Sequence, residues 1–248
     1  MDAKLRISED AERLAEEAAR HWTRRALEAI EARGVFHACL SGGSTPRRLY
    51  QYLADGELAK SLDWSRVHLW FGDERCVPPD HPDSNYGMVR EALIDHIPIP
   101  ENQVHRIHGE LSPEDAASRY ARELVHRLPD RGDGLGRFDL LMLGMGADGH
   151  TASLFPGTPA LEERDRPAVA VYVQKLDSWR VTITYPLIER AREIMLLVAG
   201  ATKAEVIARV ITAAPEAADY PVARVRAPAG ELVWWLDRAA ASRLPEAP

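Results

Sequence analysis

The sequence has only two cysteines among its 248 residues, Cys39 and Cys76, and they form no CxxC pair. A disulfide framework and a metal site built from thiolates are therefore not expected, and the cysteine content fits a reducing compartment. No stretch reaches the roughly 18 consecutive apolar residues of a membrane span, and segment 1–4 opens no apolar signal sequence. We therefore expect a cytoplasmic protein without a membrane partner.

Blocks of basic residues, internal repeats and low-complexity segments are also missing. The chain has 31 Lys and Arg residues against 38 Asp and Glu residues, which gives a net charge of -7. Because binding along a nucleic-acid backbone needs clustered cations, nucleic acid is not an expected partner. Hydrophobic residues make up 46% of the chain, enough for a sizeable core. We expect one domain over residues 1–248, and the composition is compatible with a monomer.

Strand-like and helix-like segments alternate along the chain. Small and apolar residues that recur every three or four positions predict a helix over 8–33, closed by Gly34. The same periodicity predicts helices over 47–54, 84–94, 112–128 and 202–213, with a short one near the C-terminus. Apolar, β-rich runs predict strands over 35–40, 67–71, 138–143, 168–173, 181–185, 194–199 and 231–236.

This alternation favours the α/β class, with a doubly wound, mostly parallel sheet that has helices on both faces. The segment 129–137, PDRGDGLGR, is interpreted as a surface loop rather than a domain boundary. Thr45 is predicted to cap the helix that follows it, and the spacing of Thr202 and Glu205 predicts a capping box. Ligands of such sheets bind beyond the carboxyl ends of the strands, so the loops there are the candidate sites.

The first candidate loop is Ser-Gly-Gly-Ser-Thr-Pro at 41–46, between a strand and a helix. Gly42 and Gly43 allow a ligand to approach the backbone closely, and the N–H groups of Ser44 and Thr45 open the helix. These features predict a phosphate-binding turn. An ordinary tight turn explains part of the same pattern but has no need of the additional serines and second glycine.

The second candidate loop begins at Phe-Gly-Asp-Glu-Arg, 71–75. Asp73 and Arg75 directly follow an apolar strand, where a carboxylate can bind sugar hydroxyls and a guanidinium can bind oxyanions. A solvated turn with a local pair between Glu74 and Arg75 is the alternative interpretation.

The third candidate loop follows the strand over 138–143 and contains G-x-G-x-x-G at 144–149. A dinucleotide site also requires a sustained helix directly after the glycines, which the prolines further on interrupt. The loop instead presents His150, a residue suited to proton abstraction near neutral pH, with Asp148 placed to hold its tautomer. A histidine that only caps the next turn is the alternative.

Other candidates are cations and histidines outside these loops. Arg180 precedes a predicted strand and Lys203 lies at the start of a predicted helix, where either can meet an oxyanion. His105 and His108 form an HxxH pair, but on an extended segment they point to opposite faces, so no metal site is predicted.

Four segments in this order closely resemble the 6-phosphogluconolactonase family: SGGSTPRRLY, FGDERCVPPDHPDSNYGMVREAL, FDLLMLGMGADGHTASLFPG and RVTITYPLI. The resemblance spans nearly the whole chain. It implies a cofactor-independent hydrolase that converts 6-phospho-D-glucono-1,5-lactone to 6-phospho-D-gluconate. It also implies an α/β fold shared with the glucosamine-6-phosphate deaminases, so a phosphorylated sugar lactone is the expected partner.

For such a hydrolase we hypothesise that His150 is the general base, oriented by Asp148, and that Asp73 binds substrate hydroxyls. The resemblance implies that the 6-phosphate is bound by Gly42, Gly43, Ser44, Thr45 and Lys203, with Arg75 or Arg180. The related deaminases are the alternative, but they carry a glutamate five residues after the histidine, where this chain has Phe155.

Overall fold

The protein is described by a computed structural model that covers residues 4–128 and 135–245. In this part of the chain, seven parallel strands form the main sheet in the order β1-β10-β9-β6-β2-β3-β5. These strands are β1 (Lys4–Ser8), β2 (Phe36–Leu40), β3 (Val67–Phe71), β5 (Val104–His105), β6 (Leu140–Leu143), β9 (Glu193–Val198) and β10 (Glu231–Asp237).

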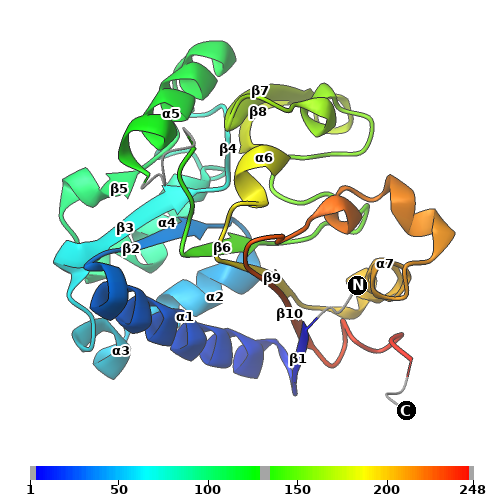
Figure 1. Ribbon diagram of the computed structural model, residues 1–248, viewed down its shortest axis with the longest axis horizontal. Coiled ribbons are helices and arrows are strands. Elements are labelled where there is room, and N and C mark those ends of the chain that lie inside the picture. Colours follow the sequence, from blue (N-terminus) through cyan, green and yellow to red (C-terminus); the bar gives the residue numbers. More distant parts are fainter. Residues whose placement is uncertain (1–3, 129–134, 246–248) are drawn as a thin grey trace.

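Helices cover both faces of the main sheet, as predicted. Figure 1 shows α1 and α2 on one side of the sheet and α5 on the other. The helices are α1 (Ala11–Arg33), α2 (Ser44–Ala54), α3 (Gly56–Lys60), α4 (Asn85–Ala92), α5 (Pro113–Arg127), α6 (Tyr185–Ile188) and α7 (Ala204–Ile211). The central strands β2, β6 and β9 are buried along their whole length, which accounts for their continuous apolar sequences. None of the described helices is long and apolar enough to cross a membrane.

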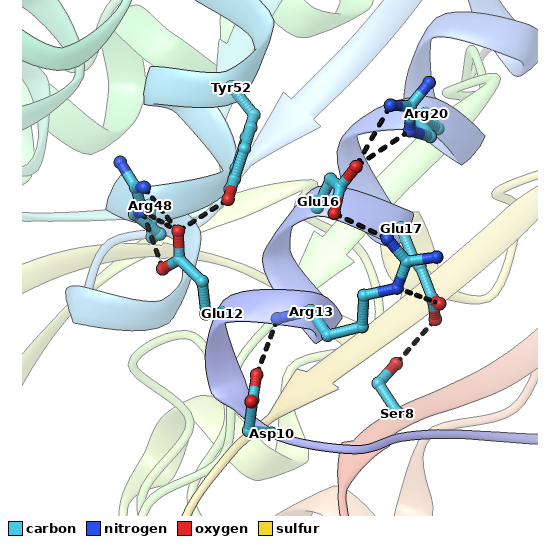
Figure 2. Close-up of polar contacts among 9 residues, drawn as sticks. All are labelled: Ser8, Asp10, Glu12, Arg13, Glu16, Glu17, Arg20, Arg48 and Tyr52. Carbon is cyan, nitrogen blue, oxygen red and sulfur yellow. Dashed lines mark hydrogen bonds and ion pairs between the residues drawn. The ribbon is translucent and has the colours of Figure 1, made fainter.

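The first helix begins later than predicted, because a strand precedes it. Ser8 ends β1 instead of opening α1, and the carboxylate of Asp10 accepts a hydrogen bond from the Arg13 N–H at 2.8 Å to cap the helix (Figure 2). Figure 2 also shows Glu12 accepting hydrogen bonds from Arg48 and Tyr52, which fixes the start of α1 against α2. The predicted stop is correct, since Gly34 adopts the left-handed conformation at the C-cap.

Two predicted strands lie outside the main sheet. The segments at 168–173 and 181–185 form β7 (Ala168–Val173) and β8 (Ser178–Ile183), an antiparallel pair with β4 (Asp73–Arg75) at its edge. Tyr185 belongs to α6 rather than to the strand. Helix α5 packs on this small sheet and also bonds to the main sheet, since the Tyr120 hydroxyl donates to the Phe71 carbonyl.

Two predicted caps and one predicted helix are wrong. Helix α2 starts at Ser44 with Gly43 as its N-cap, so Thr45 is already inside the first turn. Thr202 lies in a 3₁₀ turn that precedes α7, and no side chain caps that helix. The segment after β10 forms turns instead of a helix. Residues 129–134 of the predicted surface loop lie outside the described residues.

The strand order places a ligand site between β2 and β6. From β2 the sheet continues through β3 and β5 in one direction, whereas β6 and the later strands lie in the other. The loops after β2 and β6 therefore diverge at this point and leave a crevice at the carboxyl edge. The first and third candidate loops are the ones that follow these two strands.

A buried histidine on β2, His37, predicts a loss of stability in acid. Burial lowers the pKa of His37 from 6.5 to about 3, and the neutral ring accepts a hydrogen bond from the Trp70 indole at 3.1 Å. The unfolded chain binds this proton more readily than the folded protein. The contribution of His37 to the free energy of unfolding is therefore fully present above pH 6.5 and is lost as the pH falls toward 3. At pH 5 the expected loss is about 2 kcal/mol.

Urea unfolding at pH 7 and pH 5 measures this loss. The variant His37→Gln keeps an acceptor for Trp70 but has no titrating ring, so its free energy of unfolding should fall less between the two pH values. Equal losses in the wild type and the variant would contradict the assignment.

Candidate active site

A cavity of about 350 Å³ opens at the carboxyl edge of β2, β3, β6 and β9. The predicted site residues lie in five separate segments of the sequence, and all of them line this cavity except Asp148, which contacts the ring of His150. The lining residues among them are Gly42, Gly43, Ser44, Thr45, Asp73, Arg75, His150, Arg180 and Lys203.

The turn after β2 presents backbone N–H groups to the cavity. Gly43 has a φ of 109°, which favours glycine, and no described side chain caps α2. The positive end of this helix therefore faces the cavity at Ser44. Gly42 is required for packing, because a Cβ there would lie 1.9 Å from Oδ1 of Asn85. The Tyr50 hydroxyl holds the turn by donating to the Ser41 carbonyl at 2.8 Å.

Three cations line the same cavity without an ion-pair partner among the described residues: Arg75, Arg180 and Lys203. The two arginines are paired across β4 and β8, and both have a buried Nε without a hydrogen-bond partner in the described part of the chain. Burial, followed by the charge of Arg75, lowers the pKa of Arg180. Unpaired, partly desolvated cations beside a helix N-terminus make this cavity suited to an anionic ligand.

The carboxylates of the second candidate loop have different surroundings. Asp73 accepts hydrogen bonds from Ser153 Oγ at 2.6 Å and Asn85 Nδ2 at 3.2 Å, and it still lines the cavity. Glu74 turns away and accepts the N–H groups of Asn85 and Tyr86, both at 2.7 Å, at the start of α4. The alternative of a local pair between Glu74 and Arg75 side chains is therefore wrong.

The third candidate loop holds the imidazole of His150 in one orientation. Its Nδ1 lies 2.5 Å from Oδ1 of Asp148, which assigns the Nδ1 proton to this contact. Nε2 has no hydrogen-bond partner among the described residues, so its lone pair is available. On one side the ring stacks on buried Phe155, with centroids 4.1 Å apart and planes at 21°.

Burial is the main cause of a low pKa for His150. It lowers the pKa from 6.5 to about 4, Asp73 opposes the shift, and the cations Arg180, Lys203 and Arg75 add to it. The imidazole is therefore neutral at physiological pH and able to accept a proton. A histidine that only caps a turn does not require this arrangement.

Glycine at position 146 is needed for His150 to take its place. A Cβ at Gly146 would lie 2.1 Å from both Cε1 and Nδ1 of His150, whereas one at Gly144 would lie 3.6 Å from its nearest neighbour, Ser41 Oγ. We expect Gly146→Ala to lower kcat at least 10-fold by displacing the imidazole. The matched variant Gly144→Ala should stay within about 2-fold of the wild type. Equal kcat values for both variants would contradict this packing.

Several contacts were not predicted from the sequence. Asn85 and Ser153 position Asp73, and Lys175 forms an ion pair with Asp148. For Asn85 and Ser153 the sequence signal is their position in or next to a candidate loop, whereas Lys175 lies far from all three loops in the sequence and carries no such signal. The G-x-G-x-x-G segment leads into turns and no α-helix occurs over 144–167, all of which the structure describes.

The HxxH pair does not form a common site. His105 is buried and bonds to Glu123 and His68, whereas His108 bonds to Glu110. In the part of the chain that the structure describes, no group of three or more His, Cys, Asp or Glu side chains is arranged to hold a metal ion.

Comparisons with known proteins show the family to which the chain belongs. A family model described as glucosamine-6-phosphate isomerases/6-phosphogluconolactonase matches residues 9–234. The 6-phosphogluconolactonase of Haemophilus influenzae is 41% identical over 82% of this chain and 85% of its own length. That of Synechocystis sp. is 42% identical over 90% of each chain. The solved structure of the Trypanosoma brucei 6-phosphogluconolactonase has a TM-score of 0.86 and 29% identity, and covers 98% of this chain and 99% of its own.

Proposed function

Because the chain belongs to the family of glucosamine-6-phosphate isomerases and 6-phosphogluconolactonases, we propose that it hydrolyses 6-phospho-D-glucono-1,5-lactone to 6-phospho-D-gluconate. The protein is then a carboxylic ester hydrolase of the oxidative pentose phosphate pathway. One observation carries the assignment: a neutral, oriented imidazole and an anion-binding turn face the same cavity. A phosphorylated, activated ester requires these two groups.

His150 acts as the general base on water. Its Nε2 takes a proton as the water oxygen attacks C1 of the lactone, and a tetrahedral oxyanion forms. The oxyanion collapses, the bond between C1 and the ring oxygen breaks, and the imidazolium returns the proton to that oxygen. Asp148 keeps the imidazole in the tautomer with a free Nε2 and stabilises the imidazolium. No covalent intermediate is needed, because a δ-lactone is already an activated ester.

The phosphate anchors the substrate for this attack. The N–H groups of the 42–45 turn and the Lys203 ammonium bind the dianion, and Arg75 and Arg180 add positive charge beside it. Asp73 accepts hydrogen bonds from sugar hydroxyls. The phosphate is remote from C1, and its binding holds the lactone carbonyl next to His150. This orientation of the substrate lowers the activation barrier of the hydrolysis.

The deaminase alternative is disfavoured at Phe155. In the deaminases this position carries the glutamate that assists ring opening, whereas here a phenyl ring stacks on His150. Ester hydrolysis needs only a base and water, so the apolar ring is compatible with it. The described contacts of His150 include a single carboxylate, that of Asp148.

A pair of assays tests the proposal. Acid release is followed after addition of the freshly made phosphorylated lactone, with the spontaneous rate subtracted, and ammonia release is followed with glucosamine 6-phosphate. We expect acid release without ammonia release. Ammonia release, or no acid release above the spontaneous rate, would refute the assignment.

We also propose the setting in which the enzyme works. The mechanism uses only water and His150, so no cofactor is needed. All the proposed substrate contacts come from one chain, which is compatible with a monomer formed by a single domain over residues 1–248. We propose the cytoplasm as its compartment because its two cysteines are both free.

A further inference from the structure

A lysine from the turn between β7 and β8 contacts the third candidate loop. Lys175 lies in the 3₁₀ turn Gln174–Leu176 that joins β7 to β8. Its Nζ forms an ion pair with Oδ2 of Asp148, while Oδ1 of the same carboxylate is 2.5 Å from His150 Nδ1. Oδ1 of Asp148 therefore contacts the histidine of its own loop, whereas Oδ2, which has no hydrogen-bond partner among the described residues, has only the ion pair with a lysine from the distant turn between β7 and β8.

The same lysine supports His150 by a second route. Its Nζ lies 4.7 Å from the centroid of the Phe155 ring, and that ring stacks on His150 at 4.1 Å. His150, Asp148, Lys175 and Phe155 thus contact one another in a closed cycle, which we call the four-residue cycle. A cation over the face of an aromatic ring is attracted to that ring. Lys175 therefore holds both the Asp148 carboxylate and the Phe155 ring, which are the two groups that contact the imidazole.

We propose that Lys175 is a positioning residue for His150: it fixes the Asp148 carboxylate and the Phe155 ring that together set the orientation of the general base. This inference rests on the proposed role of His150. Lys175 does not line the substrate cavity, and half of its side chain is exposed. It therefore acts through Asp148 and Phe155 and not on the substrate.

The charges around His150 fix the direction of the expected effect. Lys175 disfavours the imidazolium by its own charge and by neutralising Asp148, so its removal should raise the pKa of His150. Both contributions have the same sign. The other charged groups that face the imidazole are Asp73, Arg75, Arg180 and Lys203.

The experiment compares Lys175→Met with Lys175→Arg. The Met variant keeps the length of the side chain but loses the charge, and we expect kcat to fall about 10-fold with KM within about 2-fold of the wild type. Lys175→Arg keeps a cation for Asp148 and should recover most of the activity. The matched control is Lys4→Met on β1, which removes an exposed ion pair with Glu231 on β10 and should behave as the wild type.

NMR titration of the His150 imidazole provides the readout that does not depend on activity. The His150 signals are assigned by their absence in His150→Asn. In Lys175→Met the midpoint should rise by about half a pH unit or more, and in Lys4→Met it should not move. Should Lys175→Met fail to fold, Lys175→Gln serves in its place.

The outcomes separate this inference from the proposed function. A folded Lys175→Met protein with wild-type kcat, or with reduced kcat but an unmoved His150 titration, would overturn the positioning role. A wild-type protein that does not hydrolyse the phosphorylated lactone would refute the proposed function, and the titration would still show whether Lys175 acts on His150.

Discussion

Replacing His150 with asparagine is expected to lower kcat by about 10²–10⁴-fold and to leave the KM for the phosphorylated lactone nearly unchanged. Asparagine can still bond to Asp148 but has no lone pair able to take a proton from water. The phosphate anchors in the 42–45 turn and at Lys203 are untouched, so binding persists. Steady-state rates at pH 7, corrected for spontaneous hydrolysis, measure the effect.

A second histidine provides the control for this variant. His108 is also partly exposed and also bonds to a carboxylate, Glu110, but it does not line the cavity. His108→Asn should therefore retain wild-type kcat. If His150→Asn retained it as well, His150 would have no part in the chemistry.

The second large effect is expected at Lys203. Replacing it with alanine removes a charged hydrogen bond to the 6-phosphate, which contributes about 1.5–3 kcal/mol, and so should lower kcat/KM for the phosphorylated lactone about 10- to 100-fold. The value for unphosphorylated glucono-1,5-lactone should change by less than about 3-fold, because that substrate never forms the contact.

The comparison of the two substrates makes this result specific. Lys60→Ala, an exposed lysine on α3, should change neither value. Equal losses on both lactones in Lys203→Ala would show that Lys203 acts on the reacting carbonyl or on folding and not on the phosphate.

Much of the fold could be predicted because buried parallel strands have continuous apolar sequences. Strands such as β2 and β9 are buried at every position, and so the runs that form them stand out from the helices between them. The edge strand β1 was missed because four of its five residues are exposed and its sequence carries two charges. The sequence of strand β8 resembles that of a strand in the main parallel sheet. Its place in the separate antiparallel sheet depends on pairing with β7 and with β4, which is distant along the chain.

The site was predictable where its residues follow one another, and not where distant segments meet. Asp148 and His150 are two residues apart, so their contact could be proposed from spacing alone. The pairing of Arg75 with Arg180 depends on the register between β4 and β8. The contact of Lys175 with Asp148 likewise depends on where the turn after β7 folds over the loop. Local sequence does not encode such long-range distances.

A crystal structure with the stable product, 6-phospho-D-gluconate, tests the geometry of this mechanism most directly. The phosphate should bind at the 42–45 turn and Lys203, and C1 should lie within about 4 Å of His150 Nε2 or one water molecule away. A bound phosphate at that turn with C1 more than about 10 Å from the imidazole, beyond the reach of any bridging water, would contradict the assignment of His150 as the base.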